Sequence, residues 1–173
     1  RVCAMGFHDR DYNEDSSGAF ANEVMHSFVF AYGSKQLGEW MLGVKANPFA
    51  HMGAAMKIGA ELFLGIKPAP PRVTKLHQRL SHLGPKLETW TRDLAHAVKR
   101  MFKVHEEGLI TNQMIQRRLS SVAIWIHAAA CSASRCDMNL RKGANGHTMD
   151  DEIVIVEHVF ALAGEKIGAA LRG

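Results

Sequence analysis

The sequence predicts an all-α protein, an antiparallel bundle of about five helices. Apolar residues recur three and four positions apart over several long stretches, which is the spacing of one helix face. Alternating runs of β-branched residues, which indicate strands, are few. The connections between the stretches are short, and short connections favour antiparallel neighbours. A chain of 173 residues is long enough for one compact unit and too short for two ordinary domains.

The longest of these patterns predicts a helical hairpin that organises the rest of the bundle. It runs from Pro85 to Cys136, and Glu106, Glu107 and Gly108 interrupt it. We expect Gly108 to end the first helix in the left-handed conformation. The expected core positions of the hairpin are Leu87, Trp90, Leu94, Ala97, Met101, Ile115, Leu119, Val122, Ile126, Ala129, Ala133 and Cys136.

The N-terminal part of the chain divides into a polar lead-in and a long helix. Residues 1–18 show neither a helical nor a strand period, so we expect an irregular segment there. From Ala19 to about Val44 the residues form a helical pattern that is apolar over much of its circumference. A helix of this kind is normally buried between neighbours.

A second helix is predicted after Asn47 and Pro48, a capping residue followed by a proline suited to the first helical turn. The proline-rich stretch 67–71 ends it. We therefore interpret residues 19–72 as a helical segment that contains a basic amphipathic helix. The predicted apolar positions of this second helix are Met52, Ala55, Gly59, Leu62 and Ile66.

Residues 73–173 are predicted to form the helical bundle proper. The hairpin is preceded by Gly84-Pro85, where either a short separate helix ends or the long helix is kinked. Residues 141–146 have the composition of a loop. The last helix follows that loop, with the expected core positions Met149, Ile153, Val156, Phe160, Ala163, Ile167 and Ala170.

Cysteine usage and apolar runs bear on the compartment. The three cysteines are an odd number, and Cys131 and Cys136 are spaced neither as a metal pair nor on one helix face. We interpret them as reduced, buried thiols in a reducing intracellular compartment, the cytoplasm or, in a eukaryote, the mitochondrion. No apolar run is long enough for a membrane-spanning helix. The chain begins with Arg1, and we expect it to be cut or processed from a longer protein.

Candidate reactive groups are weak in this sequence. Glu23 and His26 have the Glu-x-x-His spacing of di-iron bundles, but a second such motif is missing, so we do not expect a metal. Ser132 and Ser134 lie among small residues, where close packing explains them better than nucleophilic catalysis.

Positive charge is concentrated in one part of the chain. Between Lys35 and Lys75 there are six Lys and Arg against two Glu, an excess equal to the formal net charge of +4 of the whole chain. Together with many apolar residues, Lys45, Lys57 and Lys67 give this segment the composition of helices that contact an anionic membrane surface. The alternative is that the apolar stripe packs on the bundle and the lysines face water. Nucleic acid is not expected, because no aromatic-basic platform accompanies the charge.

A series of four motifs occurs in order along the chain. The motifs are residues 22–28 (Asn-Glu-Val-Met-His-Ser-Phe), 47–49 (Asn-Pro-Phe), 113–119 (Gln-Met-Ile-Gln-Arg-Arg-Leu) and 133–135 (Ala-Ser-Arg). This series resembles the C-terminal region of very-long-chain-type acyl-CoA dehydrogenases, from about Ala21 to the end, in the same order and at similar spacing. The resemblance implies an all-helical segment: the tail of the flavoprotein's C-terminal helical domain, a region linked to membrane association, and an appended helical bundle.

The resemblance does not supply the catalytic base. In the family a glutamate in a Glu-Gly-Thr-Asn-like motif removes the substrate's α-proton, and Ala19 stands at that position here, followed by Phe20. Ala21, Asn22 and Glu23 match positions that contact the adenosine end of FAD. The rest of the flavin site would lie upstream, so we expect FAD in the complete enzyme and none bound by this chain alone.

Two functions therefore stand as hypotheses. In the first, the chain is the C-terminal helical part of a FAD-dependent fatty acyl-CoA dehydrogenase and serves subunit packing and membrane association. Its partners would be further copies of itself or the upstream dehydrogenase domains, with peripheral contact to a membrane. In the second, it is a non-enzymatic helical-bundle protein that binds a partner or a lipid surface.

Overall fold

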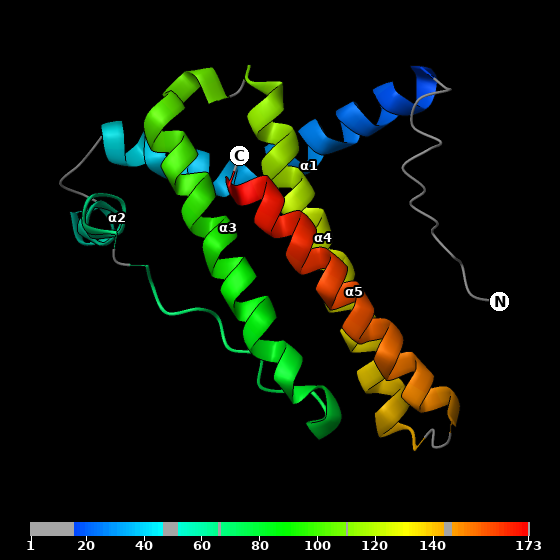
Figure 1. The fold of residues 1–173 in the computed structure, drawn as a ribbon. Coiled ribbons are helices and arrows are strands. Elements are labelled where there is room, and N and C mark those ends of the chain that lie inside the picture. The colour runs from blue at the N-terminus through cyan, green and yellow to red at the C-terminus, as the bar shows by residue number, and fades with distance from the viewer. Residues whose placement is uncertain (1–15, 47–51, 66, 110, 144–146, 173) are drawn as a thin grey trace.

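The computed structural model describes residues 16–46, 52–65, 67–109, 111–143 and 147–172, and within them the fold is all-helical without strands (Figure 1). The predicted fold class, a helical bundle with five α-helices, is confirmed. Two short 3-10 turns, η1 and η2, flank the third helix. The bounds are α1 Ser16–Ala46, α2 Met52–Leu64, η1 Gln78–Leu83, α3 Gly84–His105, η2 Glu106–Leu109, α4 Gln113–Arg141 and α5 His147–Arg172.

Three of the helices form the antiparallel part of the bundle. In Figure 1, α3 runs up, α4 runs down and α5 returns along α4. Helix α1 passes behind α3 and α4 and crosses them, and α2 stands to one side, in contact with α3. The hairpin of α3 and α4 is thus the element that every other helix contacts.

The main core confirms the predicted faces of α4 and α5. In α5, the predicted positions from Met149 to Ile167 are buried, and Ala170 is half-buried. Leu80 and Leu83 of η1 close the lower end of the same core. The rings of Trp90 and Phe160 pack with their centroids 5.6 Å apart. The other buried members are Leu87, Val122, Ala129, Ala133 and Cys136.

A smaller core lies where α1 crosses the hairpin. Phe30 of α1 packs with Leu109 and Leu119, and its ring centroid is 6.4 Å from that of Phe102. The outer side of α1 stays exposed, however, at Val24, Met25, Phe28 and Tyr32. The expectation that this helix is buried between neighbours was therefore wrong. A helix that is apolar around its circumference has two faces, and the hairpin covers one of them.

The turn between α3 and α4 also differs from expectation. Gly108 does not adopt a left-handed conformation; α3 continues into the 3-10 turn η2 instead. The next helix begins with a side-chain cap, because the Asn112 side chain accepts a hydrogen bond of 3.2 Å from the Ile115 amide. A positive φ of 75° occurs instead at Gly143, where the predicted loop after α4 begins.

An extended strap, residues 67–77, leads from α2 back along α3 to η1 (Figure 1). It is held by hydrogen bonds to both hairpin helices. The Val73 amide donates to Glu88 on α3 at 2.7 Å, and the His77 amide donates to Asp137 on α4 at 2.5 Å. The predicted proline-rich end of the second helix and a separate short helix before Gly84, one of the two alternatives, are thereby confirmed.

Two further expectations need correction. The first helix begins at Ser16 rather than Ala19, so residues 16–18 are helical and not part of an irregular lead-in. Cys131 is exposed on α4, whereas Cys136 is buried as expected. The predicted core stripe of this helix already leaves out Cys131, so its exposure agrees with the helical pattern and contradicts the interpretation of the thiols as buried. Residues 1–15, including Cys3, lie outside the described part of the chain.

Candidate functional site

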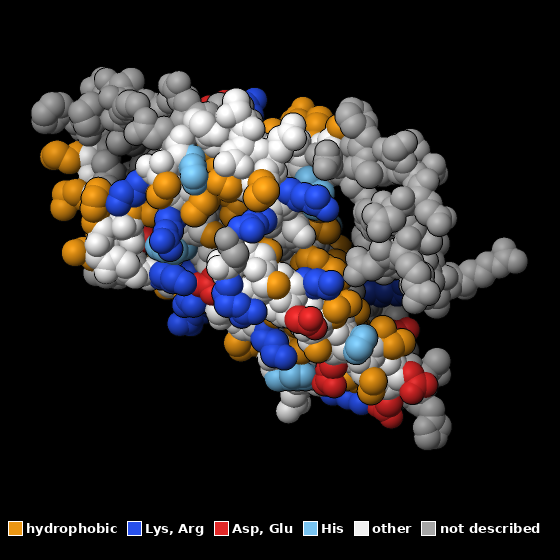
Figure 2. All heavy atoms as spheres, turned by 45° about the horizontal axis from the view of Figure 1, so that its top comes forward, with side chains coloured by type: hydrophobic (Ala, Val, Ile, Leu, Met, Phe, Trp, Pro, Cys, Tyr) orange, Lys and Arg blue, Asp and Glu red, His pale blue; other side chains and the backbone are white. Residues whose placement is uncertain are grey.

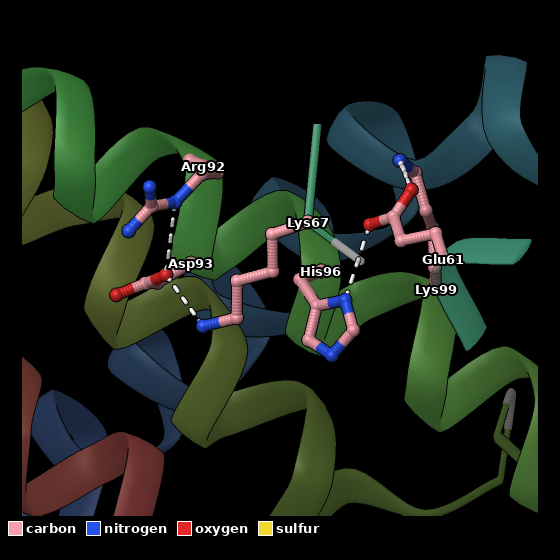
Figure 3. Close-up of polar contacts among 6 residues, drawn as sticks. All are labelled: Glu61, Lys67, Arg92, Asp93, His96 and Lys99. Carbon is pink, nitrogen blue, oxygen red and sulfur yellow. Dashed lines mark hydrogen bonds and ion pairs between the residues drawn. The ribbon is translucent and has the colours of Figure 1, made fainter. Parts of the chain in front are cut away.

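A buried ion-pair cluster joins α2 to α3. Glu61, on α2, has a side chain that is only 5% exposed. Its Oε2 accepts a hydrogen bond of 2.7 Å from Nζ of Lys99, and its Oε1 lies 3.1 Å from Nδ1 of His96 (Figure 3). Lys99 and His96 are three residues apart on α3, so one turn of that helix supplies both partners.

The electrostatics of the cluster favour the charged carboxylate. Burial by itself raises the pKa of Glu61, but the hydrogen bonds from Lys99 and His96 outweigh it, and the pKa is lowered. A buried carboxylate without such partners would carry a large desolvation cost. The two partners on α3 therefore offset the desolvation cost of burying the Glu61 carboxylate at this position.

A second cluster lies one turn away. Asp93 on α3 accepts a hydrogen bond of 2.8 Å from Nζ of Lys67, at the start of the strap, and lies 3.4 Å from Nε of Arg92 (Figure 3). Burial raises the pKa of Asp93, and the contacts with Lys67 and Arg92 more than offset this, so the pKa is lowered. This cluster fixes the segment that follows α2.

Basic side chains form a continuous face of α3 beside α2. Arg92, His96, Lys99 and Lys103 are spaced by four, three and four residues, which places them on one side of the helix. Nζ of Lys103 lies 3.4 Å from the ring centroid of Phe63 on α2, a cation–π contact. We call these four residues the basic face of α3.

Helix α2 turns large apolar side chains away from the bundle. Phe63 is 77% exposed and Met56 is 70% exposed, and Met52 and Leu64 are exposed as well. Figure 2 shows hydrophobic side chains gathered at this edge of the molecule, with Lys and Arg side chains beside them. We call Met52, Met56, Phe63 and Leu64 the apolar face of α2.

An apolar cavity of about 380 Å³ lies near the clusters, between α1, α3 and α4. Its volume falls in the range of small-ligand pockets. Three of its hydroxyl groups, those of Ser34, Thr91 and Ser120, donate to main-chain carbonyls of their own helices. Ser120 also lies 2.8 Å from Nδ1 of His26. The lining residues are Val29, Phe30, Gly33, Ser34, Leu37, Thr91, Leu94, Ala95, Val98, Lys99, Leu119, Ser120 and Ala123.

The polar groups of the Glu61 cluster and of the cavity are engaged in contacts between helices or within them. The Glu61 carboxylate is saturated by two cationic or hydrogen-bonding partners, and the serine and threonine hydroxyls of the cavity are engaged within their helices. Among the described residues, no three His, Cys, Asp or Glu side chains converge as metal ligands. Likewise, none of the described helices is long and apolar enough to cross a membrane.

The residues predicted from sequence for membrane contact lie in different environments. Lys57 is exposed on α2, and Lys67 follows that helix but is paired with Asp93. Lys45 is in the last turn of α1, and its side chain is outside the described part. Lys57 thus lies on α2 and Lys67 just beyond its end, while the structure brings other residues, Lys99 and Lys103, against the helix.

The residues implied by the dehydrogenase resemblance all lie at the start of α1. Ala19, Ala21, Asn22 and Glu23 belong to its first turns, and their side chains are not among those described. Neither the position of the family's base nor the flavin-contact positions are therefore tested. His26, the partner of Glu23 in the Glu-x-x-His spacing, is directed at Ser120.

Sequence reasoning missed Glu61, His96 and Lys99. One signal was available: Glu61 is the single acidic residue of a helix whose other residues, apart from Lys57, are apolar or glycine. The other was the four-three-four spacing of the basic face of α3. Neither signal identifies the other as its partner, because the two segments are separated by the strap.

Comparisons with known proteins add no family assignment. The chain matches no model of a known protein family, and no curated protein matches it.

Proposed function

We propose that this chain is the C-terminal helical part of a FAD-dependent fatty acyl-CoA dehydrogenase, and that it serves subunit packing and membrane association. Support comes from the ordered series of motifs between Ala21 and the end, together with an all-helical fold of the kind that the resemblance implies. Dehydrogenation requires a carboxylate base, a flavin and a pocket in one place. In this proposal the base and most of the flavin site belong to the upstream part of the enzyme.

Helix α1 supports a role in subunit packing. Its outer face exposes Val24, Met25, Phe28 and Tyr32, and the rings of Phe28 and Tyr32 pack with centroids 4.4 Å apart. The first part of α1 projects past α4 in Figure 1. A contiguous apolar surface of this kind marks a contact site for protein. The occupant in this proposal is a second subunit of the dehydrogenase.

Helix α2 supports membrane association, and its arrangement is the observation that carries this part of the proposal. It exposes Phe63 and Met56 while burying Glu61. Cations lie close by: Lys57 is exposed on the same helix, and Lys103 contacts Phe63. Apolar side chains flanked by lysines match the surface of an anionic bilayer, which takes up the former and attracts the latter.

Sedimentation with lipid vesicles tests the membrane role. We expect the chain to sediment with phosphatidylcholine vesicles that contain anionic phosphatidylserine, less with pure phosphatidylcholine, and less again at high salt, because salt screens exposed charges. The double substitution Met56→Ser and Phe63→Ser should abolish sedimentation. The matched control is Val154→Ser with Ile155→Ser, since these residues are exposed to a similar degree on α5. Equal sedimentation of the two double variants would contradict the membrane role.

Flavin content tests the dehydrogenase assignment. The protein produced together with its upstream coding sequence should be yellow, and a long-chain acyl-CoA should bleach its flavin absorbance. A colourless protein of that extended sequence, which still sediments with vesicles, would favour the alternative, a non-enzymatic helical bundle on a lipid surface.

A further inference from the structure

Helix α2 is attached to the bundle with the reverse of the usual polarity. Met52, Met56 and Phe63 are spaced by four and seven residues, so they share one face, and all three are exposed. Glu61 lies on the other side of the helix, toward α3, and is the one described residue of α2 that is fully buried. The acid faces inward and the largest apolar side chains face outward.

Apolar burial alone does not select this rotation. The half-buried side chains of α2 include Ile58 and Leu62, while Met56 and Phe63 stay in water. Since the hydrophobic effect scales with the apolar area removed from water, a rotation that buried Met56 and Phe63 and exposed Ile58 and Leu62 would exchange one pair of large apolar side chains for another. Another interaction must therefore hold the helix as observed.

The contacts of Glu61 are directional and can hold α2 in the observed rotation. Each carboxylate oxygen has its own partner: Oε2 meets Lys99 at 2.7 Å, and Oε1 meets His96 at 3.1 Å. Both partners project from one turn of α3, on the side that α2 contacts (Figure 3). Rotation of α2 about its axis would break both contacts at once and leave Lys99, whose side chain is only 17% exposed, without its counter-ion.

From this geometry we infer that Glu61 is the positioning residue of α2: its contacts with Lys99 and His96 set the rotation of the helix and hold its apolar face outward. Lys103 assists at the edge, because its ammonium group lies against the ring of Phe63 and keeps that ring beside the basic face of α3. The consequence for lipid docking, a membrane-facing surface assembled before lipid is met, rests on the proposed function. The rotation itself does not.

Thiol labelling in water, without lipid, tests the inference. In a background in which Cys3, Cys131 and Cys136 are replaced by alanine, single cysteines are introduced as Met56→Cys, on the exposed face, and Leu62→Cys, on the half-buried face. With Glu61 present, the first should react much faster with a thiol reagent than the second. Glu61→Ala should lower the ratio of the two rates by about tenfold or more, as expected when a hydrogen bond to a charged group is lost.

Two further variants control for indirect effects. Asp93→Asn removes the partner of Lys67 but leaves the Glu61 contacts intact, so the ratio should stay at its original value. Lys99→Glu should lower the ratio as Glu61→Ala does, and the exchanged pair Glu61→Lys with Lys99→Glu should restore it in large part.

Two results would contradict the positioning role of Glu61. An unchanged ratio in Glu61→Ala, or a loss of the ratio in Asp93→Asn as large as that in Glu61→Ala, would overturn the positioning role. Vesicle sedimentation is measured separately. A protein that shows the labelling pattern but ignores anionic vesicles would refute the membrane proposal and leave the role of Glu61 standing.

Discussion

The carboxylate of Glu61 on α2 and the ammonium group of Lys99 on α3 form a 2.7 Å ion pair between side chains that are 5% and 17% exposed. The pair joins segments 38 residues apart in the chain. It also links the helix with the most exposed apolar side chains to the hairpin at the centre of the bundle. The attachment of α2 therefore includes buried polar contacts as well as apolar burial, and it should respond to charge.

Removal of the ammonium group should loosen α2 while leaving the bundle folded. In Lys99→Met, Glu61 keeps His96 alone, and the free energy of local opening of α2 should fall by about 1.5–3 kcal/mol, the range for a hydrogen bond to a charged group. Hydrogen exchange of the α2 amides measures this change. Lys86→Met, at an exposed position of α3, is the matched control and should leave exchange unaltered. Similar exchange in the two variants would contradict the prediction.

The attachment of α2 should weaken in acid. The pKa of Glu61 is lowered from its ordinary value of 4.5 in the folded protein, and a lowered pKa contributes stability that is present above the unfolded value and lost as the pH falls through the folded value. The stability that Glu61 contributes to α2 should thus be present above about pH 4.5 and decrease as the pH falls below it. In Glu61→Gln the acid-dependent part should be smaller. Hydrogen exchange or limited proteolysis at a series of pH values measures the difference, and parallel profiles would refute it.

The ring of Phe160 should be a principal contributor to the main core. It is 1% exposed and packs on Trp90. Phe160→Ala leaves a cavity, and the free energy of unfolding should fall by about 3–5 kcal/mol. Leu162→Ala, two residues further along α5 and 36% exposed, should cost about 1 kcal/mol or less. Urea unfolding followed by tryptophan fluorescence measures both, and similar losses would show that the face of α5 is assigned incorrectly.

Substitutions of two phenylalanines on α1 should distinguish a contribution to folding from a contribution to association. Phe30 is 8% exposed and Phe28 is 55% exposed. Phe30→Ala should reduce the free energy of unfolding by about 3 kcal/mol, whereas Phe28→Ala should cost about 1 kcal/mol, chiefly the loss of its ring contact with Tyr32. Chemical denaturation measures these values. If the chain is part of a dehydrogenase, as we propose, Phe28→Asp should weaken subunit packing of the complete enzyme. Light scattering reports the assembly, and an unaltered assembly would count against the outer face of α1 as a contact site.

Much of the fold followed from patterns that are local. In α5, every predicted position from Met149 to Ile167 is buried, because a strictly repeated spacing of three and four has one face to bury and leaves no choice of rotation. The end of α2 was equally predictable, since proline cannot continue a helix. In α1 the pattern did not predict the buried face, because apolar residues surround the helix. The buried face there depends on which neighbouring helix packs against it.

The candidate site was predictable only in part. The accumulation of positive charge around Lys57 and Lys67 was visible in the sequence, but the pairing of Lys67 with Asp93 was not. Glu61 could be recognised as an isolated acid in an apolar helix, yet nothing in its neighbourhood along the chain indicated that it would be buried rather than exposed. An exposed acid and a buried, paired acid have the same local sequence.

Hydrophobic periodicity was enough to predict which segments are helical and, for α3, α4 and α5, which side of each helix is buried, because periodicity is a property of a single segment. It was not enough to predict that α1 buries Phe30 rather than Phe28, or that α2 turns Glu61 inward and Phe63 outward; these follow from how the helices pack. Those choices depend on the side chains that the neighbouring helices present. For α1 these are the apolar side chains at the end of the hairpin, and for α2 they are the ammonium group of Lys99 and the imidazole group of His96. Complementarity of this kind is a property of two segments together, so the sequence of either segment alone does not predict it.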